Sequence, residues 1–151
     1  MHDQMVYDWY QQYKTGLYRF ALSMLKDVHL AEDVLQEAFV RMLSLNRLPD
    51  TEKAQAWLYR VVRNICYDIL RKRKREADEP PVNTAVPEER WEFTELVAPL
   101  PQKEQEILAL RFIGGFSHKE IAQIMGITVH SAKKRYERAI HILRKEMEVM
   151  L

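Results

Sequence analysis

Apolar residues in the first half of the chain recur at the spacing of amphipathic helices. Residues 5–25 end in a helically spaced apolar set, and a short break is expected at 27–29. A third helix is expected to begin at Asp50 or Thr51, since either side chain can cap it, and to end near Arg75. Between these two, a second helix and a loop over residues 46–50 are predicted. The apolar stripe of that second helix consists of Val34, Leu35, Ala38, Phe39, Met42 and Leu43.

The predicted third helix has two contrasting faces when its residues are placed at about 100° intervals. A buried stripe is expected from Leu58, Val61, Val62, Ile65 and Ile69. The opposite face combines cations with aromatic rings: Trp57, Tyr59, Arg60, Arg63, Asn64, Tyr67 and Arg71. Cations that hold phosphates and rings that stack on unpaired bases suit single-stranded nucleic acid. The alternative is an ordinary solvated basic face with snorkelling side chains.

The second half of the chain predicts a helix-turn-helix. A short helix at 92–100 is followed by one at 102–113, which Pro101 can open and two glycines end. Ser117 and Glu120 then have the spacing of a capping box, and Gly126 supplies a tight turn. A last helix, capped by Thr128, is expected to reach about Met147. Two helices joined by a tight turn of this kind are typical of DNA-binding domains.

The predicted last helix also separates into an apolar and a charged face. The expected buried stripe is Val129, Ala132, Tyr136, Ala139, Ile140, Leu143 and Met147. The residues that its first two turns present outward are His130, Ser131, Lys133, Lys134, Glu137 and Arg138. Lysine and arginine can donate to guanine or phosphate, and a glutamate can accept from cytosine. The alternative is the charged surface of an ordinary helical bundle.

Net charge changes this picture only when it is followed along the chain. The total is +1, from 23 basic and 22 acidic side chains in 151 residues, which argues mildly against a nucleic-acid binder. However, residues 60–75 hold 7 basic and 1 acidic side chain, residues 76–106 hold 2 and 9, and residues 107–151 hold 8 and 4. Two basic blocks therefore flank an acidic segment.

The acidic segment is predicted to be a flexible linker over 76–90, because its prolines and charges disfavour helix and extend the chain. The chain also has only 4 glycines, which points away from turn-rich β folds. We therefore predict an all-α fold of two small helical domains, 1–75 and 91–151. The second of these is the helix-turn-helix domain.

Other features exclude several classes of protein. Cys66 is the single cysteine, so no internal disulfide forms, and its place at the edge of the buried stripe favours a structural role. No apolar run approaches the roughly 18 residues of a membrane span, and no signal peptide is recognised, so we expect a cytoplasmic protein without membrane insertion. Among the five histidines, His130 and His141 share a face but lie about 16 Å apart along a helix, too far to share a metal.

Three blocks of residues follow one another along the chain, from Leu17 to Phe39, from Ala56 to Arg71 and from Leu100 to Ala139. In this order they resemble the bacterial RNA polymerase sigma factors of the extracytoplasmic-function (ECF) group. The resemblance covers nearly the whole chain. It implies a protein without catalytic residues, cofactor or metal, which binds core RNA polymerase through the clamp and flap regions of its large subunits. It also implies promoter DNA and an anti-sigma factor as partners.

The resemblance further implies a role for each matching group of residues. Asp33, Gln36 and Glu37 match the surface that binds core polymerase, although an ordinary acidic helix face is the alternative on pattern alone. The face of residues 57–71 described above matches the segment that meets the minus-ten element, and 45–52 matches a base-capturing loop. The residues matched to minus-thirty-five binding are Ser117, Lys119, His130, Ser131, Lys133, Lys134, Glu137 and Arg138.

The sequence departs from the family pattern on the presumed reading face. His130 and Ser131 replace the usual Gly-Thr pair, Ala132 replaces a valine and Lys134 replaces a serine, while Glu137 lies at a variable position. The loop at 45–52 is also short. A promoter sequence therefore does not transfer from the family.

Two other classes of function are weighed against this one. An operator-binding regulator with a C-terminal helix-turn-helix explains residues 100–151, but not the aromatic residues among the cations of 57–75. A helical metalloenzyme would need a cluster of ligands, and no pair of histidine and carboxylate has suitable spacing with support elsewhere. Promoter-specific transcription with core polymerase separates the sigma factor from the regulator.

Overall fold

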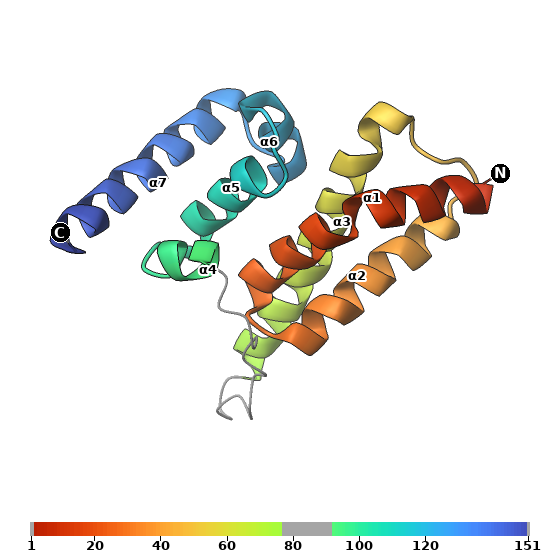
Figure 1. Cartoon of the computed structure of the whole chain (residues 1–151), viewed down its shortest axis with the longest axis horizontal. Coiled ribbons are helices and arrows are strands. Elements are labelled where there is room, and N and C mark those ends of the chain that lie inside the picture. Colours follow the sequence, from red (N-terminus) through yellow and green to blue (C-terminus); the bar gives the residue numbers. More distant parts are fainter. Residues whose placement is uncertain (1, 77–91, 151) are drawn as a thin grey trace. The chain divides into compact units, whose positions relative to one another are not determined.

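A computed structural model shows the fold and describes residues 2–76 and 92–150 (Figure 1). Every regular element in these ranges is an α-helix, so the predicted all-α class is confirmed. The chain divides into two compact units, one with the first three helices and one with the last four. The predicted linker, apart from Glu76, lies outside the described residues.

The first unit consists of α1 (His2–Leu25), α2 (Val28–Leu43) and α3 (Thr51–Arg75). Helices α1 and α2 lie side by side, and α3 packs against both of them (Figure 1). Because each helix has two neighbours, the apolar surface that it buries is wider than one narrow stripe. The core includes Leu17, Phe20, Val34, Met42, Leu58, Tyr59, Val62 and Ile65.

The boundaries and caps of these helices differ from the prediction in two details. The break between α1 and α2 lies at Lys26 and Asp27, because the Asp27 carboxylate accepts from the Leu30 amide at 3.0 Å and caps α2. Residues 28 and 29, which were expected in the break, are therefore helical. Helix α3 begins at Thr51 as predicted, but the Asp50 side chain makes no capping hydrogen bond.

The second unit consists of α4 (Glu92–Val97), α5 (Gln102–Phe112), α6 (His118–Met125) and α7 (Val129–Met150). The predicted capping box is confirmed: the Ser117 hydroxyl accepts from the Glu120 amide at 3.2 Å, and the Glu120 carboxylate accepts from the Ser117 amide at 3.0 Å. Gly126 ends α6 with φ 69°, a left-handed conformation that glycine adopts at no steric cost. The Thr128 hydroxyl accepts from the Ser131 amide at 3.0 Å and caps α7.

Helix α7 is longer than the elements that cover it. It has 22 residues, or about 33 Å, whereas α5 has 11 residues and α6 has 8. The middle of its predicted apolar stripe is buried, at Ala132, Ala139 and Leu143. Its ends are not, since Val129 is 39% and Met147 is 51% exposed, so the prediction of a stripe buried throughout was wrong there.

Candidate nucleic-acid and partner interfaces

The first candidate interface is an exposed face of α2. Asp33, Gln36 and Glu37 are all exposed and share one face, because their spacing of three and four residues follows the helical turn. Glu37 forms a 2.6 Å ion pair with Arg41, and both side chains are about half exposed. Val40 continues the same face and is 59% exposed. The surface therefore offers carboxylate and amide acceptors beside an aliphatic side chain.

The second candidate interface is the polar face of α3. Arg60, Asn64 and Arg71 are exposed along it, as predicted. Three further predicted residues, Trp57, Arg63 and Tyr67, are half-buried. The Arg63 guanidinium stacks over the Tyr67 ring at 4.7 Å from its centroid. Arg71 pairs with Asp68 one turn earlier on the same helix.

Tyr59 does not belong to this face, and its predicted exposure was wrong. Its side chain is 1% exposed and packs against Phe20, with ring centroids 5.2 Å apart. Packing of α1 and α2 on α3 extends the buried surface past Cys66 to Tyr59, beyond the apolar stripe that the sequence shows. Burial raises the pKa of the Tyr59 hydroxyl well above its ordinary value of 10.0.

The third candidate interface is the helix-turn-helix of α6 and α7. All of its predicted DNA-binding side chains are exposed: Ser117, Lys119, His130, Ser131, Lys133, Lys134, Glu137 and Arg138. Two of them also serve the local fold. The Ser117 hydroxyl caps α6, and the Ser131 hydroxyl accepts from that of Thr128 at 2.9 Å. The cations of the early turns of α7 therefore project from a helix whose start is held by hydrogen bonds.

A groove between the start of α5 and the middle of α7 brings further charged residues to this surface. Its walls are Lys103, Glu104, Ser131, Lys134, Arg135, Glu137, Arg138 and His141. Lys103, Arg135 and His141 were not among the predicted site residues. Lys103 was missed because it lies about thirty residues before Lys134 in the sequence, and the packing of α5 on α7 brings both residues to the same groove.

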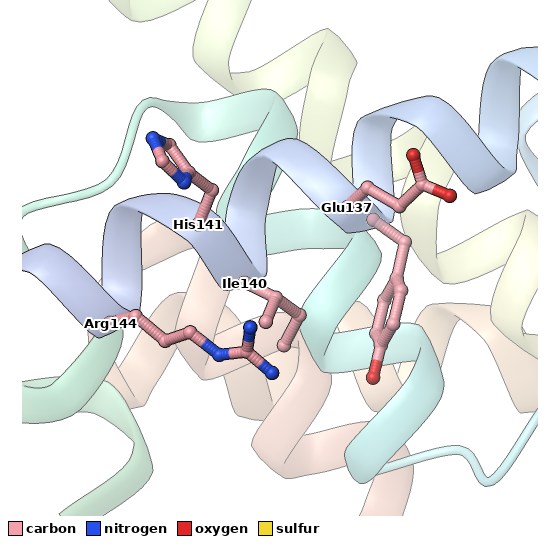
Figure 2. Close-up of a pocket in the computed structure, with 5 residues that line it drawn as sticks. Glu137, Ile140, His141 and Arg144 are labelled. Atoms are coloured by element: carbon pink, nitrogen blue, oxygen red, sulfur yellow. The ribbon is translucent and has the colours of Figure 1, made fainter.

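A second, smaller pocket lies along α7. Figure 2 shows Glu137, Ile140, His141 and Arg144 at its edge, with the Arg144 side chain beside that of Ile140. Tyr136 completes the lining. The ring of Tyr136 also meets that of His118 at the start of α6, with centroids 5.0 Å apart. Its lining includes Tyr136 and Ile140, whereas the groove beside Lys103 is lined by polar and charged residues alone.

Comparison with known proteins decides the family of this chain. Residues 9–76 match the family model for Sigma-70 region 2, and residues 90–141 match that for Sigma-70, region 4. The chain is 35% identical to the ECF RNA polymerase sigma factor SigM of Bacillus subtilis, in an alignment covering 86% of this chain and 87% of that protein. The chain belongs to the ECF sigma factors. The two matched regions correspond to the two units: the first covers most of α1 and all of α2 and α3, and the second covers α4 to the middle of α7.

Other comparisons agree with this assignment. The sigma factor is 32% identical to the ECF sigma factor EcfG of Rhodopseudomonas palustris, over 82% of this chain and 75% of that protein. Its fold is similar to that of CnrH in complex with the cytosolic domain of CnrY, with a TM-score of 0.75, 20% identity and coverage of 97% and 90%. It is also similar to RpoE in complex with the anti-sigma factor NepR from Bartonella quintana, with a TM-score of 0.70, 24% identity and coverage of 94% and 98%.

Two other classes of site are absent from the part of the chain that the structure describes. Within residues 2–76 and 92–150, no helix is long and apolar enough to cross a membrane. In the same part of the chain, no three His, Cys, Asp or Glu side chains are grouped so that they could hold a metal ion. The candidate surfaces of this sigma factor are helix faces that carry charged, amide and aromatic side chains.

Proposed function

We propose that this sigma factor directs transcription initiation by binding core polymerase through α2 and recognising promoter DNA through α3 and α7. The observation that carries the proposal is the separation of three exposed helix faces of different chemistry. One is acidic and amide-bearing, one is basic with aromatic rings, and one is the basic surface of a helix-turn-helix. Each suits a different partner.

The face of α2 is proposed to bind the clamp of core polymerase. Asp33 and Gln36 are exposed acceptors at its centre, and Glu37 is held by Arg41. An exposed ion pair of this kind is worth only about 0–1 kcal/mol, so Glu37 can exchange Arg41 for a cation of the partner at little cost.

The polar face of α3 is proposed to meet the minus-ten element as its strands separate. Trp57 and Tyr67 offer rings for stacking on unpaired bases, while Arg60 and Asn64 offer donors for phosphates and base edges. Tyr59 is excluded from this set by its burial. The loop that precedes α3 is proposed to lie next to the flipped base, although it spans only residues 44–50.

The helix-turn-helix is proposed to bind the minus-thirty-five element as duplex. The first turns of α7 are the part of a recognition helix that enters the major groove. Lys133, Lys134 and Arg138 can donate there to guanine or phosphate. Lys103, in the groove beside α7, is proposed to add a phosphate contact at the edge of this surface.

Four further aspects of function are proposed from the family, the composition and the solved structures of similar fold. The sigma factor performs no chemistry of its own, and it acts in the cytoplasm, where polymerase and promoters are found. Its acidic segment over 76–90 serves as the tether between the two DNA-binding units and passes through the basic channels of the polymerase. An anti-sigma factor is proposed as its regulator, since two proteins of similar fold were solved with a protein partner.

The experiment that tests the proposed function is transcription in vitro with purified core polymerase. Templates are drawn from genomic positions where the protein and polymerase coincide on DNA. Core polymerase with the sigma factor should give transcripts with defined starts, and core polymerase alone should not. If the protein only represses transcription by another sigma factor, it is an operator-binding regulator and the proposal is wrong.

A further inference from the structure

One arginine of the basic tract at the end of α3 differs in its surroundings from its neighbours. The tract runs from Arg71 to Arg75, and its other four residues are exposed. The Arg73 side chain is only 38% exposed and turns back toward the start of α2. Its sequence neighbours gave no indication of this, because all five residues are cations on the last turns of the helix.

Arg73 contacts two groups at the junction of α1 and α2. Its Nη1 donates to the carbonyl oxygen of Leu25 at 3.4 Å, and its Nη2 donates to Oδ2 of Asp27 at 3.4 Å. The other oxygen of that carboxylate, Oδ1, accepts from the Leu30 amide at 3.0 Å. The Asp27 side chain is 15% exposed, so one partly buried carboxylate joins the start of α2 to the end of α3.

The junction that Arg73 contacts is a place where the backbone needs support. Leu25 is the last residue of α1, and the final carbonyls of a helix lack intrahelical partners and carry its negative dipole end. Lys26, the next residue, has φ 56°, in the left-handed region that side chains other than glycine rarely adopt. A guanidinium can donate to both the free carbonyl and the capping carboxylate.

We propose that Arg73 is a positioning residue, which ties the end of α3 to the α1–α2 junction and so sets the position of α2. The proposal rests on the proposed function of α2 as the polymerase-binding helix. As a consequence, the residues of the basic tract have two different roles. Arg73 supports polymerase binding from behind α2 and does not contact DNA, whereas the exposed cations of the tract remain available to phosphates.

The test is a double-mutant cycle in the full-length protein, with Arg73→Ala, Asp27→Asn and the two combined. Asparagine still caps a helix, so Asp27→Asn removes the charge but keeps the cap of α2. Each single variant should weaken core polymerase binding about threefold to fivefold, as expected for one partly exposed ion pair. The double variant should be no weaker than the worse single variant, because both remove the same link. Arg75→Ala is the matched control and should bind core polymerase as the wild type does.

A second measurement separates positioning from contact with DNA. Holoenzyme binding to a promoter fragment is followed at several salt concentrations, because each phosphate contact contributes about 0.9 to the slope of log K against log salt. Arg73→Ala should leave that slope unchanged. If the slope falls by about 0.9, as for the loss of one phosphate contact, and core polymerase affinity is unchanged, the proposal is wrong and Arg73 is one of the cations that bind DNA.

A third variant distinguishes failure of this inference from failure of the proposed function. The combined Asp33→Ala and Gln36→Ala variant alters the α2 face directly. If it weakens core polymerase binding and Arg73→Ala does not, the positioning role is wrong while the function of α2 stands. If it leaves binding unchanged, the proposed function of α2 is itself wrong. Urea unfolding of each variant shows that the first unit is folded.

Discussion

Replacement of Tyr59 by alanine should destabilise the first unit and should act on DNA binding only through unfolding. The side chain is 1% exposed and packs on Phe20 at a centroid distance of 5.2 Å. Removal of a buried aromatic side chain costs about 3–5 kcal/mol, through lost burial and the cavity left behind. A small domain has a total stability of about 5–15 kcal/mol, so the loss is a large share of it.

Urea unfolding followed by circular dichroism measures this loss in the full-length protein. Tyr67→Ala is the matched control, because Tyr67 lies half-buried on the polar face of the same helix. It should cost about 1 kcal/mol or less. It should nevertheless weaken promoter opening, since its ring is proposed to stack on a base. If Tyr59→Ala unfolds at the wild-type urea concentration but loses promoter opening, Tyr59 meets DNA and the burial argument is wrong.

The raised pKa of Tyr59 adds a dependence on pH to the same prediction. In the folded protein the pKa of this hydroxyl lies above its ordinary value of 10.0. As pH rises, the unfolded chain therefore loses the proton before the folded chain does. The stability contribution is therefore complete below pH about 10 and declines above it, by at most about 1.4 kcal/mol per pH unit. Tyr59→Phe should remove this part of the alkaline decline. If the free energy of unfolding declines equally in the wild type and in Tyr59→Phe between about pH 9 and about pH 11, this argument is wrong.

The remaining predictions concern the other surfaces and one helix cap. The combined Asp33→Ala and Gln36→Ala variant should retain less core polymerase in a pull-down and remain folded by circular dichroism. If it retains as much core polymerase as the wild type, the assignment of α2 is wrong. Lys134→Ala and Arg138→Ala should each weaken duplex promoter binding and lower its salt slope by about 0.9, measured by fluorescence anisotropy, while core polymerase binding stays intact. Loss of core polymerase binding with DNA binding retained would reverse the assignment of the two units. Ser117→Ala should destabilise the second unit by about 0.5–2 kcal/mol in thermal unfolding, because it removes the cap of α6, and a stable variant would show that the capping box contributes little.

The elements that could be predicted from the sequence are those with local chemical causes. The capping box at Ser117, the left-handed Gly126 and the Thr128 cap each depend on residues within four positions of one another. Together they define the start and end of α6 and the start of α7. The exposed charged face of α7 was predicted for the same reason, since helical periodicity alone places its residues outward.

The features that could not be predicted depend on packing between distant segments. Tyr59 looked exposed because the apolar stripe of α3 ends before it, but α1 and α2 together cover a wider arc than that stripe. A polar-tipped ring can extend a core where a charged side chain cannot, so the pattern of apolar letters underestimates the buried surface. Arg73 and Lys103 were missed for a similar reason, since their partners at Asp27 and along α7 are far away in sequence.

Three cations of the first unit already have a carboxylate partner. Arg41 is paired with Glu37, Arg71 with Asp68 and Arg73 with Asp27. The Arg71 pair is exposed and worth only about 0–1 kcal/mol, so Arg71 can exchange Asp68 for a phosphate at little cost, whereas the partner of Arg73 is only 15% exposed. Since phosphate contacts supply most of the affinity for nonspecific DNA and the net charge of the chain is only +1, the free protein should bind DNA weakly. Promoter affinity should then arise mainly in the holoenzyme, where the proposed binding of α2 to polymerase would bring both basic surfaces to the same DNA.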